Sequence, residues 1–174
     1  LSIGDDSYGT NTFHNMNIGV RGFRSDLNVY NCKFDSIRAI YFYNSKGNAS
    51  AVVIIGDTAN NVASSLRVHP IDPSLKNMDY CQTGVYSFYS NLAVYGCFMD
   101  HMFDGVTVYH CKDNLVTGVN GNEINARHHG IYLFDNYGGL YQNFESNRIT
   151  IDGEKSGVGI LAQELKTASS FNCT

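Results

Sequence analysis

The sequence contains no tryptophan and only two prolines in 174 residues, and charged residues make up only 16% of it. Lysine and arginine number 12 against 16 aspartates and glutamates, so the formal net charge is −4. Such a chain has no net positive field to attract nucleic acid or anionic lipid. No apolar run approaches the roughly 20 residues of a bilayer-spanning helix. We therefore expect no nucleic-acid partner and no membrane insertion.

Glycine (17), tyrosine (12) and phenylalanine (10) are abundant, and asparagine recurs throughout. Asparagine and glycine favour tight turns, whereas aromatic and β-branched residues favour strands. The composition therefore predicts an all-β chain, and the length suits one domain spanning residues 1–174. Because the sequence starts at Leu1 rather than at a methionine, we expect it to be an excerpt of a longer chain.

A repeated pattern is the main signal in the sequence. A large apolar residue, a turn residue, cysteine or asparagine and a second apolar residue recur in four segments: Val29–Phe34, Val94–Met99, Val119–Ile124 and Phe144–Ile149. Each is followed by a short alternating strand: Ile40–Phe42, Val106–Val108, Ile131–Leu133 and Val158–Ile160. Self-similarity of this kind is the signature of a repeat architecture.

The spacing of the repeat identifies its type. Cys97, Asn122 and Asn147 follow one another at intervals of 25 residues, and Asn11 precedes Cys32 by 21. The segment between Cys32 and Cys97 is expected to hold three turns of about 22 residues each. Dense leucine motifs and helical periodicity are absent. The pattern therefore predicts a parallel β-helix, a solenoid of about seven coils of 21–25 residues.

The alternation also predicts the core. Alternate residues of the short strands, Ile131 and Leu133 among them, point inward and stack on the next coil. One corner column contains Cys32, Cys97, Asn122 and Asn147. Asparagine amides can form a hydrogen-bonded ladder there, and cysteine is a small apolar substitute. Five cysteines without a CxxC pair are compatible with one disulfide, but the column favours packing for Cys32 and Cys97.

The motif Asn-x-Ile-x6-Gly-Ile-x-Leu at Asn122–Leu133 resembles the right-handed parallel β-helix repeat of the pectate-lyase-like superfamily, most clearly between Leu92 and Ala162. That superfamily includes polysaccharide lyases, glycoside hydrolases, uronate epimerases, phage tailspikes and bacterial adhesins, so the fold alone does not select a function. We expect a secreted or cell-surface protein. Its expected partners are a polysaccharide or cell-surface glycan and flanking domains of the same longer chain.

One candidate for chemistry is a polar ladder just before the glycine-led strands. The 25-residue offset aligns Asp104 with His129 and His129 with Glu154, and Arg127 and His128 stand beside them. An acid, an imidazole and a second acid on a rigid ladder suit general acid–base catalysis on a sugar. The alternative is an exposed corner that merely collects polar residues.

A second candidate is the outward side of the glycine-led strands. Predicted ligand contacts are Tyr41, Tyr43, Tyr109, Tyr132 and Phe134, with His110, Asp135, Arg127 and His128 nearby. Aromatic rings on a flat sheet provide faces for sugar rings. The alternative is that a loop or another domain covers these rings, or that they only support the sheet.

No metal site and no cofactor are predicted from the residues. His128 and His129 are adjacent in an extended strand, where successive side chains point to opposite faces, so both should not bind one ion. The resemblance implies only that acidic residues such as Asp5, Asp100 or Asp104 can bind calcium, and no glycine–aspartate calcium repeat is present.

Both prolines fall in the segment 66–75, where the repeat is weakest. Because proline is excluded from central strands, the segment is predicted to be a loop that projects from the solenoid. Arg67, His69 and Asp72 could contact a ligand there, or the loop could be a stiff connector.

Three functions fit these observations. The first is a β-helix domain that binds carbohydrate or a partner surface through an exposed parallel sheet. The second is an enzyme that cleaves or modifies a polysaccharide, as a lyase, glycoside hydrolase or uronate epimerase, centred on Asp104, His129 and Glu154. The third is the structural stalk of an adhesin or tailspike. No recognisable catalytic motif decides between the first two.

Overall fold

The computed structural model describes residues 1–4, 11–38, 49–70, 76–111, 115–136, 141–153, 156–164 and 170–172. Within these ranges the regular structure is all strand, and every strand pair is parallel. The predicted all-β class is therefore correct. The described residues contain no helix long and apolar enough to cross a bilayer.

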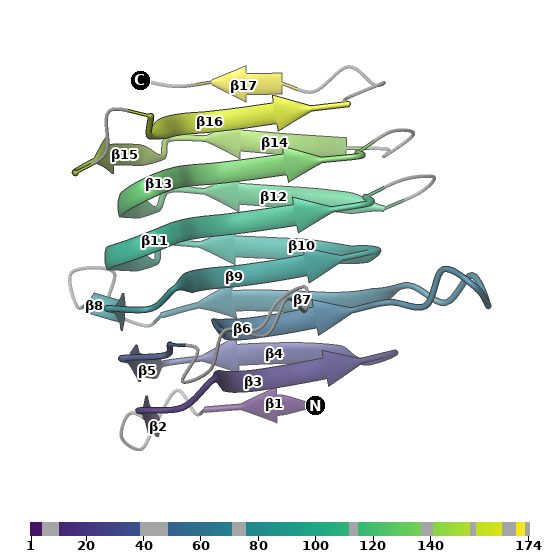
Figure 1. Ribbon diagram of the computed structural model, residues 1–174. Helices are drawn as coiled ribbons and strands as arrows, with labels where there is room; N and C mark the ends of the chain where they lie inside the picture. The colour runs from purple at the N-terminus through teal and green to yellow at the C-terminus, as the bar shows by residue number, and fades with distance from the viewer. Residues whose placement is uncertain are drawn as a thin grey trace.

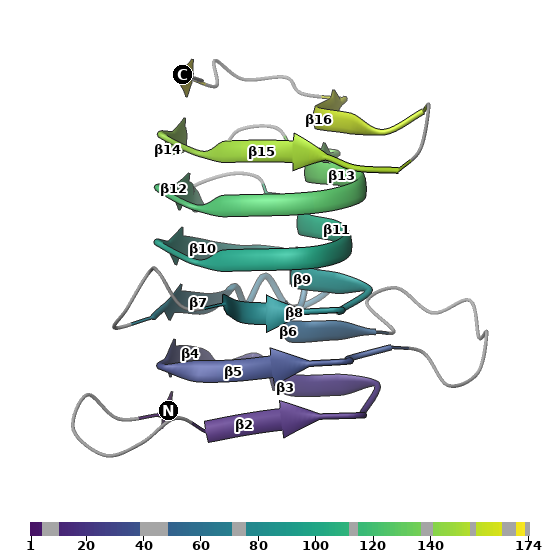
Figure 2. The ribbon, with the colours of Figure 1, turned by 90° about the vertical axis from the view of Figure 1, so that its left-hand side faces the viewer.

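The strands lie on three faces that the chain visits in turn (Figures 1 and 2). The first face is a seven-stranded sheet made of β1 (Ser2–Ile3), β4 (Asp26–Tyr30), β7 (Ser64–His69), β10 (Ser90–Tyr95), β12 (Val116–Asn120), β14 (Tyr141–Glu145) and β17 (Ser170–Asn172). The second face holds β2 (Asn11–His14), β5 (Cys32–Asp35), β8 (Lys76–Asp79), the first halves of β11 (Phe98–Tyr109) and β13 (Glu123–Phe134), and β15 (Arg148–Ile151). The third face holds β3 (Ile18–Phe23), β6 (Ser50–Ile55), β9 (Thr83–Phe88), the second halves of β11 and β13, and β16 (Val158–Gln163). Stacking of this kind is a general β-solenoid arrangement.

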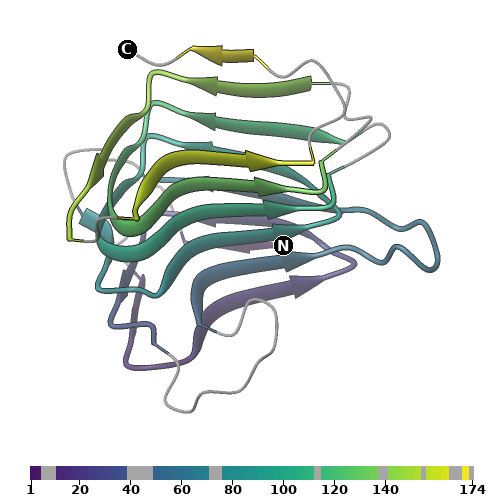
Figure 3. The ribbon, with the colours of Figure 1, turned by 45° about the horizontal axis from the view of Figure 1, so that its top comes forward.

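The long strands β11 and β13 bend from the second face onto the third, as Figure 3 makes visible. In β11 the bend lies at His101, whose φ is +52°. The register of the β11–β13 pair shifts between Met99 and Met102 and again between Met102 and Asp104. The inward–outward alternation of an ideal strand is therefore interrupted at this corner.

The corner that follows the third face is built by residues with left-handed backbone conformation. Tyr89, His110 and Asp135 have φ between +46° and +58° and end β9, β11 and β13. The backbone N–H of His110 donates to the Phe134 carbonyl at 3.0 Å, and that of Asp135 donates to the Gln163 carbonyl at 3.2 Å. The sharp turn thus keeps its backbone donors paired with the next strand.

The core follows the predicted columns. Val85 pairs with Val106, Val106 with Ile131, and Ile131 with Ile160, and the first three side chains are fully buried. Leu133, two residues further along β13, is fully buried as well. The glycine-led strands therefore face inward in the predicted register.

The predicted asparagine ladder is present. The Asn122 amide donates to Asn147 Oδ1 at 2.9 Å and to the Val94 carbonyl at 3.1 Å, and Asn122 Oδ1 accepts the Cys97 N–H at 2.9 Å. Cys32 and Cys97 are buried free thiols that pack in the core, as predicted. The ladder satisfies backbone groups that the corner would otherwise leave unpaired.

A second ladder at another corner was not predicted. Asn136 is fully buried, accepts the Cys111 N–H at 2.7 Å and donates to the Val108 carbonyl at 3.3 Å. It again joins a cysteine in one strand layer to an asparagine 25 residues later.

The predicted three turns between Cys32 and Cys97 are wrong. Phe34 pairs directly with Met78, and Met78 with Met99, so two steps cover this stretch. The chain is longer per turn here because Ser50–Ile55 forms β6 on the third face between β3 and β9. The predicted strand Ile40–Phe42 lies outside the described residues.

The predicted loop at 66–75 is also wrong in its first part. Leu66 and Val68 are buried in β7, which pairs with β4 and β10 on the first face. Pro70 follows the end of this strand and interrupts no ladder. The segment that projects in Figure 1 lies earlier, between β6 and β7, where Asp57 and Val62 form a short antiparallel bridge. Residues 71–75 lie outside the described residues.

Candidate functional site

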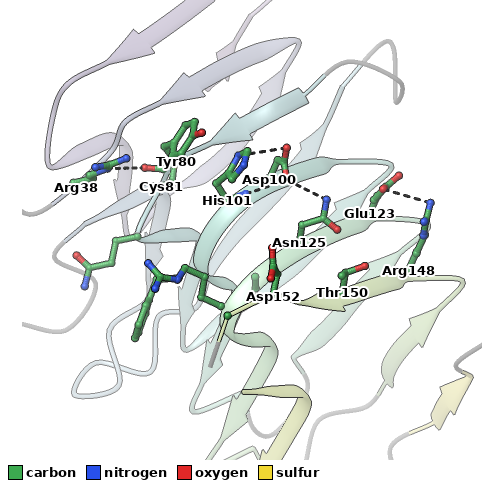
Figure 4. A pocket seen from close by; sticks show the side chains of 15 residues that line it. Arg38, Tyr80, Cys81, Asp100, His101, Glu123, Asn125, Arg148, Thr150 and Asp152 are labelled. Carbon is green, nitrogen blue, oxygen red and sulfur yellow. Dashed lines mark hydrogen bonds and ion pairs between the residues drawn. The ribbon is translucent and has the colours of Figure 1, made fainter. Parts of the chain in front are cut away.

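A polar hollow of about 1070 Å³ lies on the second face and the adjoining corner (Figure 4). Its lining comes from Arg38, from the end of β8 and the residues after it, from β11 and β13, and from β15 and the residues after it. The lining residues are Arg38, Tyr80, Cys81, Gln82, Asp100, His101, Phe103, Glu123, Asn125, Ala126, Arg127, Arg148, Thr150, Asp152 and Gly153. The hollow therefore crosses several strands instead of following one.

Polar side chains form rows across these strands. Asp100 pairs with Asp79 on one side, and its Oδ1 accepts the Asn125 amide at 3.1 Å on the other. Asn125 in turn pairs with Thr150 of β15. Neighbouring parallel strands lie about 4.8 Å apart, so the row offers one hydrogen-bonding side chain at each such interval. This geometry suits an extended polar ligand.

Ion pairs hold the acidic part of the row in place. Lys76 pairs with Asp100, and His101 Nδ1 lies 2.9 Å from Asp79 Oδ1. Burial raises the pKa of Asp100, but hydrogen bonds from Lys76 and Asn125 outweigh it and hold that pKa below its ordinary value. Asp100 is therefore an anion near neutral pH and acts as an acceptor, not as an acid.

Aromatic rings add apolar surface to the hollow. The Tyr80 ring stacks on His101 with centroids 4.2 Å apart, and the backbone carbonyl of Tyr80 accepts the Arg38 Nε–H at 3.2 Å. Phe103 stacks on His128 at 4.8 Å. Tyr80 and Phe103 remain 44% and 38% exposed. The hollow thus combines polar rows with exposed ring edges.

Two charged side chains in the hollow have no partner within the part of the chain that is described. Arg127 and Asp152 are both exposed, and no ion pair or hydrogen bond is formed there by either side chain. Groups of this kind can bind a ligand without first breaking an internal contact.

The predicted neighbours Asp104 and His129 do lie side by side. They pair across β11 and β13, and His129 Nδ1 is 2.9 Å from Asp104 Oδ1. The expected third member is displaced, because His129 pairs with Val158 and not with the position of Glu154. The chain is longer between β13 and β16 than the 25-residue offset assumes. Glu154 itself lies outside the described residues.

The argument that His128 and His129 point to opposite faces is wrong. His128 Nδ1 lies 3.1 Å from Asp104 Oδ1, the same atom that His129 approaches. The two imidazole rings are 3.7 Å apart. These residues follow the bend at which the strand register shifts, so the alternation that underlies the prediction does not apply there.

The predicted aromatic surface lies on the third face. Tyr109 contacts Tyr132 and Phe134 with ring centroids 5.6 Å apart in each case, and all three rings are half-buried. Burial, with Tyr132 beside it, raises the pKa of Tyr109 to about 12. His110 forms an ion pair with Asp135 at the edge of this surface.

The aromatic surface is less open than predicted. Tyr86, next to Tyr109, is only 5% exposed, and the Tyr132 hydroxyl donates to Gln163 Oε1 at 2.9 Å. Tyr41 and Tyr43 lie outside the described residues.

Sequence reasoning missed Asn125 and Thr150 as site residues. A signal for them exists, because Asp100, Asn125 and Thr150 follow one another at the 25-residue interval of the repeat. Arg38 and Tyr80 carry no such signal, since they come from the part of the chain where the repeat is irregular.

No protein-family model matches the chain, and searches of curated proteins and of solved structures find no match either.

Proposed function

We propose that this chain is a right-handed parallel β-helix of the pectate-lyase-like type, with about seven coils, and that it binds carbohydrate in the hollow of the second face. The polysaccharide or cell-surface glycan would lie across the strands. One observation carries the proposal: a polar row from Asp79 through Asp100 and Asn125 to Thr150 runs along a hollow of about 1070 Å³.

The chemistry of the lining supports a neutral or mildly charged sugar. Carboxylate and amide oxygens accept hydrogen bonds from ring hydroxyls, while amide and guanidinium groups donate to them. Three arginines and three carboxylates line the hollow, so it has no strong charge of either sign. The exposed edges of Tyr80 and Phe103 supply apolar contact for the carbon-bound faces of a sugar ring.

The location proposed for the protein is outside the cell, at the surface or secreted, within a longer chain. This agrees with the binding of a glycan and with the superfamily that the repeat resembles.

The proposal is tested by retention on immobilised polysaccharides, with acidic and neutral chains compared. Arg127→Ala removes an exposed, unpaired side chain of the hollow, so folding should not change. A hydrogen bond to a charged group is worth about 1.5–3 kcal/mol, so affinity should fall about 10- to 100-fold. Asn125→Ala should weaken binding as well.

The matched control is Tyr132→Ala, which alters the aromatic surface of the third face. It should leave retention unchanged if the hollow is the site. Loss of retention in Tyr132→Ala alone would place the ligand on the third face and refute the hollow. Absence of retention on every polysaccharide would favour a structural stalk.

An enzyme that cleaves or modifies a polysaccharide is the second candidate. It is favoured by the contact between Asp104 and the buried His129, a carboxylate–imidazole pair suited to proton transfer. An assay of chain length and of unsaturated ends on the same polysaccharides distinguishes it, because a binding domain leaves both unchanged.

A further inference from the structure

Asp104, His128 and His129 form a compact cluster at the corner between the second and third faces. Their ligand atoms all lie within 4.8 Å of one another. We propose that this cluster binds a divalent transition-metal ion such as Zn²⁺, with Asp104 Oδ1, His128 Nδ1 and His129 Nδ1 as its protein ligands. The proposal does not depend on carbohydrate binding in the hollow.

The distances suit such an ion. His129 Nδ1 and His128 Nδ1 lie 2.9 and 3.1 Å from Asp104 Oδ1. In a tetrahedral zinc site with bonds of about 2.0 Å, neighbouring ligand atoms are about 3.3 Å apart. The ligand atoms therefore need to separate by only a few tenths of an ångström to admit the ion.

The surroundings hold both imidazoles in orientation. The His128 ring stacks on Phe103 with centroids 4.8 Å apart, and the His129 ring stacks on Tyr132 at 5.0 Å. The backbone N–H of His129 also donates to Asp104 Oδ1 at 3.2 Å, which positions the carboxylate. Ligands that are already oriented lose less conformational freedom when an ion binds.

The cluster is also accessible. The His129 side chain is 9% exposed, whereas those of Asp104 and His128 are 19% and 34% exposed. An ion can enter from the His128 side, and three protein ligands leave a fourth position for water. Three ligands with one open position are typical of a site that can exchange or react.

The ligand types determine the class of ion. Imidazole nitrogens with one carboxylate suit zinc, copper, nickel and iron, whereas calcium takes six to eight oxygens. The second histidine–carboxylate cluster, Asp79, Asp100 and His101, serves as an internal contrast. There Lys76 already pairs with Asp100, so a cation is in place and a metal ion would have to displace it.

The test uses the untagged chain after treatment with a chelator. Calorimetric titration with Zn²⁺ should give one ion per chain, and Co²⁺ should give the visible absorption of a site with imidazole ligands. His128→Gln removes a ligand from a half-exposed side chain and should weaken Zn²⁺ binding at least about tenfold. Asp104→Asn should do the same.

The matched control is His101→Gln, which alters the contrast cluster and should leave Zn²⁺ affinity unchanged. Circular dichroism of each variant separates loss of the site from loss of the fold. Absence of a 1:1 complex at Zn²⁺ up to about 1 mM would overturn the proposal. So would equal affinity in the native chain and in His128→Gln.

Discussion

The asparagine ladder makes a sharp prediction, because one side chain satisfies several buried groups. Asn122 accepts the Cys97 N–H and donates to the Val94 carbonyl and to Asn147 Oδ1. In Asn122→Ala, Asn147 Oδ1 keeps the backbone N–H of residue 122, at 3.1 Å in the native chain. The Cys97 N–H and the Val94 carbonyl, in contrast, lose the partner that this side chain provides.

The expected magnitude follows from those two groups. A buried donor or acceptor that is left unsatisfied costs about 1–3 kcal/mol. Asn122→Ala should therefore lower the free energy of unfolding by about 2–6 kcal/mol. This is a large share of the roughly 5–15 kcal/mol by which a typical domain is stable.

Asn91→Ala is the matched control. Asn91 Oδ1 accepts the Val116 N–H at 2.9 Å across the same 25-residue offset, but Val116 is exposed. Water can replace the lost partner there, so the cost should be no more than about 1 kcal/mol. Urea unfolding followed by far-ultraviolet circular dichroism measures both variants. Equal costs, or a cost below about 0.5 kcal/mol for Asn122→Ala, would refute the reasoning.

Two further predictions concern the core and the hollow. Leu133 is fully buried, so Leu133→Ala should lower the free energy of unfolding by about 2–5 kcal/mol in the same assay, and a value near zero would mean that this residue does not face the core. The pKa of Asp100 is held below its ordinary value by Lys76 and Asn125 despite burial, so its contribution to stability is complete above the pKa of an unfolded aspartate, about 3.9, and is lost as the pH falls through the lower folded value. Asp100→Asn should therefore lose less stability than the native chain between pH 5 and strongly acid solution, and parallel acid-unfolding curves would contradict this.

The regular part of the fold could be predicted from the sequence because its period is constant. Cys97, Asn122 and Asn147 recur at 25 residues, and the ladder that joins them follows from that interval. The inward positions of Ile131 and Leu133 follow from simple alternation along one strand.

The part before Cys97 could not be predicted in the same way. Strand pairing depends on which residues meet across the stack, not on how many residues connect them, and long connections cost little free energy. The pairing of Phe34 with Met78 is therefore compatible with many chain lengths between them. Counting at a fixed period placed one turn too many in this segment.

The candidate sites divide along the same line. The pairing of Asp104 with His129 follows from the 25-residue offset. The approach of His128 to the same carboxylate depends on a bend whose register shifts have no clear signature in the sequence. The hollow depends on side chains from several strands, and only its row of Asp100, Asn125 and Thr150 could be predicted from the repeat.

The constant pairing offset has a consequence for how such a chain can change in length. Leu92 pairs with Thr117, and Thr117 with Gln142, each 25 residues further on. Removal or duplication of one whole 25-residue unit in this region returns every later residue to an equivalent place in the stack. Insertion of a single residue within a strand instead reverses which side chains face the interior. The molecule can therefore gain or lose length, and with it rows of the hollow, by recombination in whole units, whereas single-residue insertions are tolerated only at the corners.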